Sequence, residues 1–279
     1  MWHEFKISLP DELREPVTGA LFELGCVGSS DDDGVTVAYF PASEPVETVM
    51  AALRGFEGIS VEYRPIEDQD WYEPWKKSIG PMSVAGLVIC PPWKTPAPKD
   101  GEEVVIIDPG QAFGAGEHET TRMCLETIKA WTDSHTGLID MGVLDVGTGT
   151  GILAIAAYRF GFGRVTAVDI ETRAVETAGR NLALNGLVGK VKLGPGSVKD
   201  AGVGYDLIAA NLFLEVLTEN IGPIAAALNP GGGVIVSGLL EGQDDEFLLA
   251  ARAAGLHLVE KRSEGKWVCM LLAAAAPAA

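Results

Sequence analysis

The sequence predicts an α/β protein whose main part is a doubly wound parallel sheet with a terminal antiparallel hairpin, preceded by a small α+β domain. Three observations lead to this fold class. A glycine turn near residue 147 separates an apolar strand from an apolar helix, and strand and helix patterns then alternate to about residue 254. Residues 1–66 carry a shorter strand–helix pattern of their own. A length of 279 residues allows one α/β domain and one small domain.

The glycine turn lies in the segment Val143–Gly151, which reads Val-Leu-Asp-Val-Gly-Thr-Gly-Thr-Gly. A β-type run ends at Gly147, and a helix pattern over residues 152–160 follows the last glycine. Glycine is required where a Cβ would block a tight turn or the close approach of a ligand. A dinucleotide fingerprint places its third glycine three positions after the second, whereas here the interval is two. With Asp145 beside it, the turn suits a cationic ligand better than a diphosphate.

A second strand, Arg164–Asp169, ends in an acid about twenty residues after the first glycine of the turn. This is the spacing expected of a ribose-binding carboxylate in a Rossmann-like sheet. A carboxylate can accept hydrogen bonds from both ribose hydroxyls, so Asp169 is predicted to anchor an adenosine-type ligand. Glycine turns and strand-ending acids are each common without a ligand. The turn, the helix and the spaced acid together carry the prediction.

The composition excludes several classes of protein. A formal net charge of −18 argues against a broad nucleic-acid-binding surface, because phosphate neutralisation needs clustered Lys and Arg. No apolar run is long enough to cross a bilayer, and the N-terminus lacks a signal-peptide pattern. We therefore expect a cytoplasmic protein. The isolated cysteines show no metal or redox spacing, so we expect no metal site and reduced, mostly buried thiols at Cys26, Cys90, Cys124 and Cys269.

Residues 1–66 are predicted to form a ferredoxin-like domain. The pattern gives strands at residues 2–9, 35–40 and 59–66, a short strand near residue 27, and helices at about 11–25 and 44–55. Residues 67–80 are predicted to be a linker helix, in which Trp71 and Trp75 share one face. Packing against a neighbouring domain is the simplest role for that pair. Residues 81–279 then form the main domain.

The main domain opens with two segments, 82–92 and 103–108, that are predicted as an antiparallel pair of strands. The segment 108–121 is rich in glycine and is predicted to close over a ligand as a loop. A helix pattern follows at 123–131, with Thr120 or Thr121 near its start, where either could simply be the N-cap. His118 could accept a proton, although a lone loop histidine is more often only solvated.

Strands and helices alternate after the first two parallel strands. Further strands are predicted at 190–193, 205–213 and 233–240, helices at 171–185, before 228 and at 244–254, a helix stop at 229–232, and a hairpin from 257–262 and 266–272. Ligands of such sheets bind at the carboxyl ends of the strands. Asn211 ends an apolar strand at that edge, so its amide either caps a helix or holds a substrate; we favour the substrate.

These features together resemble a known family. The turn at residues 145–151 and Asp169 are similar to those of class I methyltransferases that use S-adenosyl-L-methionine. The loop 112–121, the connector with Asp70-Trp71, and Ala210-Asn211-Leu212 resemble the PrmA family, which methylates ribosomal protein L11 of the large subunit. The resemblance covers nearly the whole chain. Ala115 departs from it, because the family usually has Thr there.

The resemblance implies both a cofactor site and a reaction. The residues expected to contact S-adenosyl-L-methionine are Thr121, Gly147, Asp169 and Asn211, with Phe113 and Gly149 close by. Asn211 is also the expected catalytic residue, because its side-chain oxygen can accept protons of a neutral amine and orient the lone pair toward the methyl group. A lysine amine has an ordinary pKa near 10.4, so the site must favour its neutral form by desolvation.

The resemblance also implies the partner. The family methylates lysine side-chain and N-terminal amines of free ribosomal protein L11, and residues 1–66 would recognise that protein. Two alternatives stay open: a methyltransferase for another protein lysine or a small amine, and a non-catalytic regulator that binds S-adenosyl-L-methionine. The glycine spacing speaks against a nicotinamide dehydrogenase. We expect no direct nucleic-acid or membrane partner.

Overall fold

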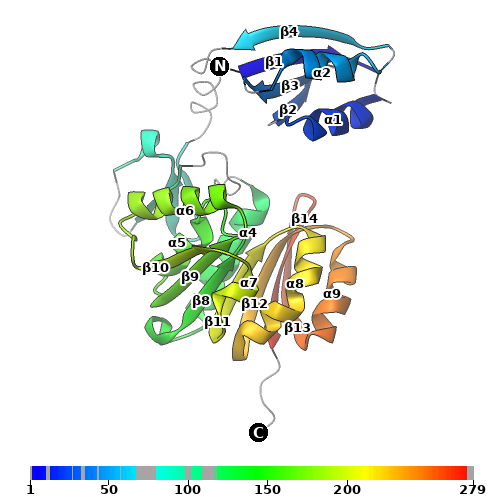
Figure 1. Cartoon of the computed structure of the whole chain (residues 1–279). Coiled ribbons are helices and arrows are strands. Elements are labelled where there is room, and N and C mark those ends of the chain that lie inside the picture. The colour runs from blue at the N-terminus through cyan, green and yellow to red at the C-terminus, as the bar shows by residue number, and fades with distance from the viewer. Residues whose placement is uncertain are drawn as a thin grey trace. The chain divides into compact units, whose positions relative to one another are not determined.

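The computed structural model of the chain describes residues 2–10, 13–26, 28–32, 35–42, 44–56, 58–66, 80–97, 102–108, 116 and 118–274 (Figure 1). The chain divides into two compact units, Met1–Ile79 and Gly80–Ala279. Apart from Gly80, the predicted linker helix at 67–80 lies outside the described residues.

The first unit is a four-stranded antiparallel sheet in the order β2-β3-β1-β4, with one helix between β1 and β2 and another between β3 and β4. Its elements are β1 (Trp2–Ser8), α1 (Arg14–Glu23), β2 (Gly28–Asp32), β3 (Val35–Pro41), α2 (Val46–Leu53) and β4 (Ser60–Ile66). Alternate residues of β3 are buried, Phe5 and Ile7 of β1 are buried beside them, and the rings of Phe5 and Phe40 pack edge to face at 5.5 Å. Leu21 of α1 and Leu53 of α2 complete this core.

The second unit begins with a three-stranded sheet of β5 (Met82–Val84), β6 (Leu87–Cys90) and β7 (Glu103–Ile106). β5 and β6 form an antiparallel hairpin, but β7 pairs with β6 in parallel. The predicted antiparallel pair is therefore wrong. The connection from 91 to 102, which includes the short 3-10 helix η2 (Pro92–Lys94), is long enough to return the chain to the starting edge of β6.

A seven-stranded sheet in the order β10-β9-β8-β11-β12-β14-β13 forms the rest of the second unit. Its strands are β8 (Gly142–Val146), β9 (Arg164–Asp169), β10 (Val191–Pro195), β11 (Tyr205–Asn211), β12 (Leu228–Leu240), β13 (Leu256–Glu264) and β14 (Trp267–Ala274). The first five strands of that order are parallel, whereas β14 runs antiparallel to both of its neighbours. The sheet is therefore mixed.

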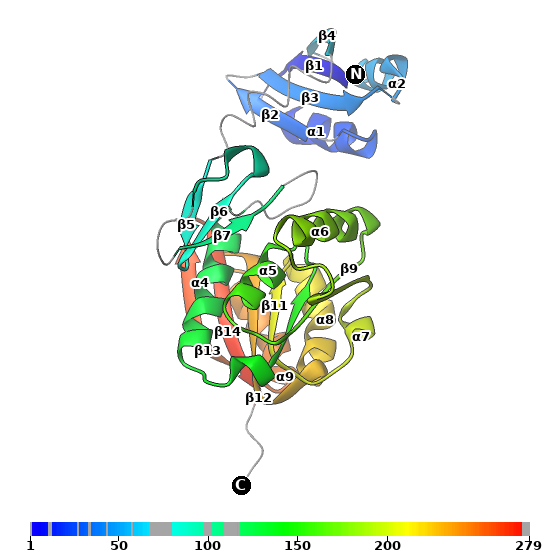
Figure 2. The same ribbon diagram turned by 90° about the vertical axis from the view of Figure 1, so that its left-hand side faces the viewer.

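Helices cover both faces of this sheet (Figure 1, Figure 2). The helices are α4 (Glu119–Asp133), α5 (Ile152–Arg159), α6 (Thr172–Leu184), α7 (Val198–Ala201), α8 (Leu214–Ala227) and α9 (Asp244–Ala253), with the 3-10 turn η3 (Leu138–Asp140) before β8. Residues of α4, α5 and α6 share one apolar core, and residues of α7, α8 and α9 share the other. The predicted doubly wound α/β fold is confirmed. Within the described part of the chain, no helix has the length and hydropathy of a membrane span.

The start of β12 differs from the prediction. Residues 229–232 read as a helix stop, but α8 already ends at Ala227 and β12 begins at Leu228. Leu228 pairs with Tyr205, and the pairing is irregular before it resumes at Gly233. A Cβ on Gly232 would lie within 3.0–3.1 Å of three carbonyl oxygens, so the glycine here serves close packing of two strands.

Candidate active site

Three neighbouring parallel strands end at one edge of the sheet. Val146 of β8 lies opposite Val168 of β9 on one side and Ala210 of β11 on the other. The residues that follow these three are Gly147, Asp169 and Asn211. The structure thus brings these predicted site residues together at the carboxyl edge, where ligands of parallel sheets bind.

The glycine turn approaches its neighbours closely. The backbone N–H groups of Gly147 and Thr148 both donate to the carbonyl oxygen of Val168, at 2.9 and 3.0 Å. Gly147 has φ of +70°, and a Cβ there would lie 2.5 Å from Cδ2 of Leu212. Any larger residue would have to displace the side chain that follows Asn211. Glycine is therefore required by both backbone conformation and space.

Asp169 is fixed by the backbone around it. Its Oδ2 accepts the N–H of Gly149 at 2.9 Å, and its Oδ1 accepts the N–H of Glu171 at 3.0 Å. The side chain is 8% exposed, so the carboxylate is nearly buried at the edge. Each carboxylate oxygen has two lone pairs, which leaves capacity for ligand hydroxyls.

Asp145 lies below the turn and is more buried than its sequence position suggested. Its Oδ2 accepts the hydroxyl of Thr148 at 2.6 Å and the N–H of Ala154 at 3.1 Å, while its Oδ1 has no partner. Burial raises the pKa of this carboxyl to about 6; the two hydrogen bonds oppose the rise, and the charge of Asp169 adds to it. Sequence reasoning identified the acid but not its burial, which depends on the helices around it.

The start of α4 corrects the prediction about its threonines. Neither Thr120 nor Thr121 is the N-cap, because the helix begins at Glu119 and His118 caps it. His118 accepts the N–H of Thr120 at Nδ1, so an imidazole nitrogen replaces the usual cap oxygen. Thr121 is 1% exposed, and its hydroxyl has no hydrogen-bond partner.

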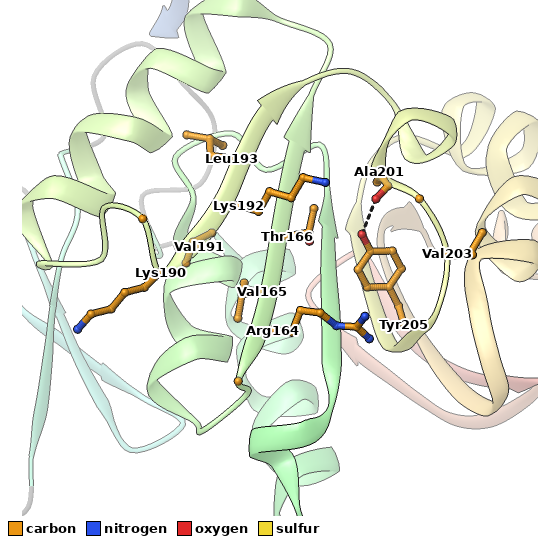
Figure 3. Close-up of a pocket in the computed structure, with 13 residues that line it drawn as sticks. Arg164, Val165, Thr166, Lys190, Val191, Lys192, Leu193, Ala201, Val203 and Tyr205 are labelled. Atoms are coloured by element: carbon orange, nitrogen blue, oxygen red, sulfur yellow. Dashed lines mark hydrogen bonds between the residues drawn. The ribbon is translucent and has the colours of Figure 1, made fainter.

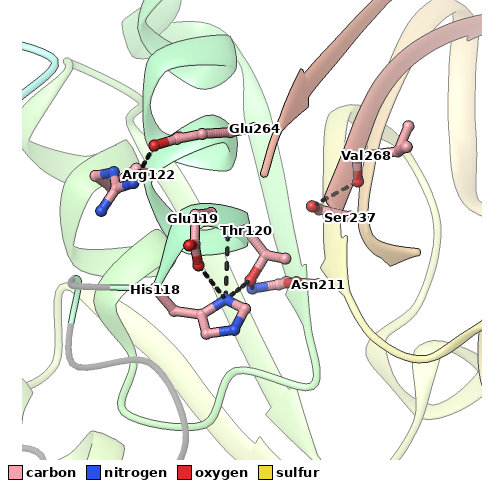
Figure 4. A network of polar contacts seen from close by, with 8 residues as sticks. All are labelled: His118, Glu119, Thr120, Arg122, Asn211, Ser237, Glu264 and Val268. Atoms are coloured by element: carbon pink, nitrogen blue, oxygen red, sulfur yellow. Dashed lines mark hydrogen bonds and ion pairs between the residues drawn. The ribbon is translucent and has the colours of Figure 1, made fainter. Parts of the chain in front are cut away.

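Asn211 belongs to a hydrogen-bonded chain that reaches α4 (Figure 4). Its Nδ2 donates to Oγ1 of Thr120 at 3.1 Å, and that oxygen lies 2.8 Å from Nδ1 of His118. The ring of His118 packs edge-on against Trp267 of β14, with 5.0 Å between the ring centroids. The His118 side chain is 32% exposed, so it is partly packed at this edge and partly solvated.

Asn181 of α6 is a structural residue that sequence reasoning missed. It is fully buried, and its Nδ2 donates to the carbonyl oxygens of Thr150 at 2.8 Å and Asp108 at 3.0 Å. Its Oδ1 accepts the N–H of Asp108. One side chain therefore ties the last part of the glycine turn to the start of the loop 108–121. The available signal was a polar residue on the helix face that also carries Ala174 and Ala178.

The loop itself is described only in part. Gly116 is buried, and a Cβ there would lie 3.3 Å from Ile152, the first residue of α5. Gly116 therefore lies beside the start of α5, which directly follows the glycine turn. Phe113 and Ala115 lie outside the described residues.

A groove lies at the opposite end of the strands (Figure 3). This amino-end groove, of about 680 Å³, is bounded by residues at the starts of β9, β10 and β11. The side chains of Arg164 and Lys192 point in the direction of Tyr205, whereas the side chain of Lys190 points the opposite way. The hydroxyl of Tyr205 donates to the carbonyl of Ala201, and the guanidinium of Arg164 donates to that of Gly204. None of the predicted site residues borders this groove.

A doubly wound sheet with an acid-flanked glycine turn and an acid at the end of the next strand is typical of the class I methyltransferases, whose fold implies S-adenosyl-L-methionine as the methyl donor. Within that class, the chain belongs to the ribosomal protein L11 methyltransferase (PrmA) family, whose model matches residues 1–275.

Individual relatives agree with the family match. The ribosomal protein L11 methyltransferase of Pelobacter propionicus is 34% identical over 306 aligned positions, covering 99% of both chains. That of Geobacter sulfurreducens is 40% identical over 74% of this chain and 67% of its own. The crystal structure of a ribosomal protein L11 methylase from Lactobacillus delbrueckii subsp. bulgaricus superimposes with a TM-score of 0.61 at 29% identity, covering 70% of this chain and 98% of that one.

Proposed function

We propose that this protein transfers methyl groups from S-adenosyl-L-methionine to lysine side-chain and N-terminal amines of free ribosomal protein L11, in the cytoplasm. The observation that carries the proposal is the family match over residues 1–275, which includes the first unit as well as the methyltransferase sheet. A methyltransferase for a small amine would give the first unit no evident task.

The edge of the sheet fits the cofactor. Thr121 Oγ1 and Asp145 Oδ1 are buried polar atoms without partners, each an arrangement that costs about 1–3 kcal/mol unless a ligand supplies the hydrogen bond. A cationic ligand also suits the ionised carboxyl of Asp145. The residues that would hold the cofactor are Thr121, Gly147, Asp169 and Asn211, with Gly149 and Phe113 close by.

The reaction depends more on the orientation of the substrate amine than on proton transfer by a side chain. When bound, the cofactor supplies a methyl group on a sulfonium centre, which a neutral amine can displace directly. The chain must hold the amine in its neutral form and direct its lone pair. Asn211 Oδ1 can accept an amine N–H, because Nδ2 of the same amide is already bound to Thr120. This is catalysis by positioning.

The first unit is proposed to recognise the protein substrate. Residues 1–66 form this ferredoxin-like recognition domain, residues 67–80 the linker, and residues 81–279 the catalytic domain. Near the site, Phe213 follows Asn211 by two positions, caps α8, and is 70% exposed. We propose that Phe213 contacts the aliphatic part of the substrate lysine.

The proposal is tested by incubating the purified protein with radiolabelled S-adenosyl-L-methionine and free ribosomal protein L11. We expect label on the ribosomal protein, and a fall of at least about 100-fold in the rate for Asn211→Ala. Asn220→Ala is the matched control, because Asn220 lies on α8 and donates only to the backbone of Val216. Its rate should stay within about twofold of wild type.

Each contrary result has a distinct meaning. Label on other proteins or on small amines, but not on L11, would establish the first alternative. Tight binding of S-adenosylhomocysteine with no transfer to any acceptor would establish a non-catalytic regulator. Equal rates for Asn211→Ala and wild type would remove Asn211 from the reaction.

A further inference from the structure

The amide of Asn211 has two ends of nearly equal size and opposite hydrogen-bonding character. If Oδ1 meets the incoming amine, it accepts an N–H and leaves the lone pair free. If Nδ2 meets the amine, it donates to that lone pair and blocks attack on the methyl group. The rate of methyl transfer therefore depends on what holds the amide in one of its two orientations.

One direction of the hydrogen-bonded chain from Asn211 to His118 satisfies both contacts at Nδ1 of the ring. A backbone N–H can only donate, and that of Thr120 donates to Nδ1 of His118 at 3.3 Å. Nδ1 is therefore an acceptor, so the hydroxyl of Thr120, at 2.8 Å, must donate to the same nitrogen in a three-centre arrangement. A hydroxyl carries one hydrogen, and its oxygen is then left to accept from Asn211.

We infer that Thr120 is a positioning residue for methyl transfer: with His118 it forces Nδ2 of Asn211 toward α4 and Oδ1 toward the substrate amine. The inference rests on the proposed function, because it assigns the orientation of the residue that meets the amine. The direction is set by a main-chain group of α4, which cannot reverse it. Burial of Thr120, at 1% exposure, keeps water from substituting for its hydroxyl.

The packing around His118 supports this role. Trp267 packs edge-on against the ring, with 5.0 Å between the ring centroids. Glu264 pairs with Arg122 one turn further along α4, which ties the end of β13 to the same helix. The ring is thus held by side chains from α4 and β14 together.

The test compares two substitutions of Thr120 in the full chain. Thr120→Val keeps the shape but cannot accept from Asn211, so kcat should fall about 10–30-fold. The KM for S-adenosyl-L-methionine and the Kd of S-adenosylhomocysteine should change by less than about twofold, since the hydroxyl orients the amine acceptor rather than the cofactor. Thr120→Ser restores the donor and acceptor, so kcat should return to within about threefold of wild type.

Thr132→Val is the matched control, because Thr132 is a buried threonine of the same helix whose hydroxyl donates to the backbone of Lys129. It should leave kcat within about twofold. Equal losses in Thr120→Val and Thr120→Ser would overturn the inference, since they would indicate packing rather than hydrogen bonding. An unchanged kcat in Thr120→Val would overturn it as well.

A measurement without catalysis separates this inference from the proposed function. Nitrogen NMR of the histidine rings should show that the neutral ring of His118 has Nδ1 unprotonated and the hydrogen on Nε2. The opposite tautomer would contradict the direction of the chain even if the protein methylates L11. The expected tautomer in a protein that methylates nothing would support the direction of the chain, while the proposed function alone would fail.

Discussion

The two ends of the parallel strands carry very different surfaces. At the amino end, the groove of about 680 Å³ is lined in part by Tyr205 and Arg164, whose polar groups are bonded to nearby carbonyls. At the carboxyl end, Thr121, Asp145 and Asp169 are each less than 10% exposed. Two of these three have a side-chain oxygen without a partner.

This difference indicates which structural feature identifies the ligand-binding end of the sheet. Among the described residues, none of the buried side-chain polar atoms without a partner lines the amino-end groove. The carboxyl edge keeps buried polar atoms at a cost in free energy that a bound ligand removes. Unsatisfied burial, rather than volume, therefore distinguishes the reactive end of this sheet.

Among the tests of this difference between the two ends of the strands, Gly147→Ala is expected to have the largest effect. Alanine at φ of +70° costs about 1–2 kcal/mol, and its Cβ would also displace Leu212 at the carboxyl edge. We expect the affinity for S-adenosylhomocysteine to fall at least about 100-fold by calorimetry. Gly186→Ala is the control, with φ of +68° but open space around its Cβ. Equal affinities in the two variants would contradict a close approach at Gly147.

Asp145 offers a pH-dependent test. Its folded pKa of about 6 lies above the ordinary 3.8, so the folded state binds a proton more tightly between these values. Its contribution to the free energy of unfolding is therefore largest below pH 4 and is lost as pH rises through 6. Asp145→Asn cannot titrate. The unfolding free energy of the variant minus that of wild type, measured in urea, should rise by about 2–3 kcal/mol from pH 4 to pH 7. A constant difference would show that the carboxyl titrates normally.

A smaller effect is expected from exposed apolar residues at the two ends. Phe213 at the carboxyl end is 70% exposed and Val203 beside the groove is 74% exposed, so truncating either costs little stability. Phe213→Ala should raise the KM for ribosomal protein L11 about 5–10-fold, because a substrate contact is lost. Val203→Ala should leave it unchanged. The reverse pattern in steady-state kinetics would move substrate contact to the amino end.

The smallest effect is expected from the groove cations. Lys192→Ala removes a charge from the amino-end groove without touching the carboxyl edge. Turnover and cofactor affinity should both remain within about twofold of wild type. A larger loss in either quantity would mean that the two ends are coupled.

Local chemistry made much of the fold predictable. The apolar run before Gly147 and the helix after it are β8 and α5, with ends within a residue of the predicted ones. Asp169 and Asn211 end their strands as the pattern indicated. Such features depend on neighbouring residues in the sequence, so a single chain reveals them.

Long-range features escaped prediction for a physical reason. Alternation of apolar residues does not encode strand direction, so the parallel pairing of β6 and β7 was missed. The contact between Asn211 and Thr120 joins residues 91 positions apart, and only the folded sheet brings them together. The sequence pattern likewise suggested the hydroxyl of Thr120 or Thr121 as the N-cap of α4, but the imidazole of His118 is the N-cap in the structure.

The position of β14 has a consequence for the newly made protein. β14 follows every other described element along the chain, yet it lies inside the sheet between β12 and β13. Because chains emerge from the ribosome N-terminus first, the glycine turn and the strand of Asn211 are synthesised before Trp267 can pack against His118. A growing chain therefore has the glycine turn, Asp169 and Asn211 before the ring of His118 gains its packing partner on β14.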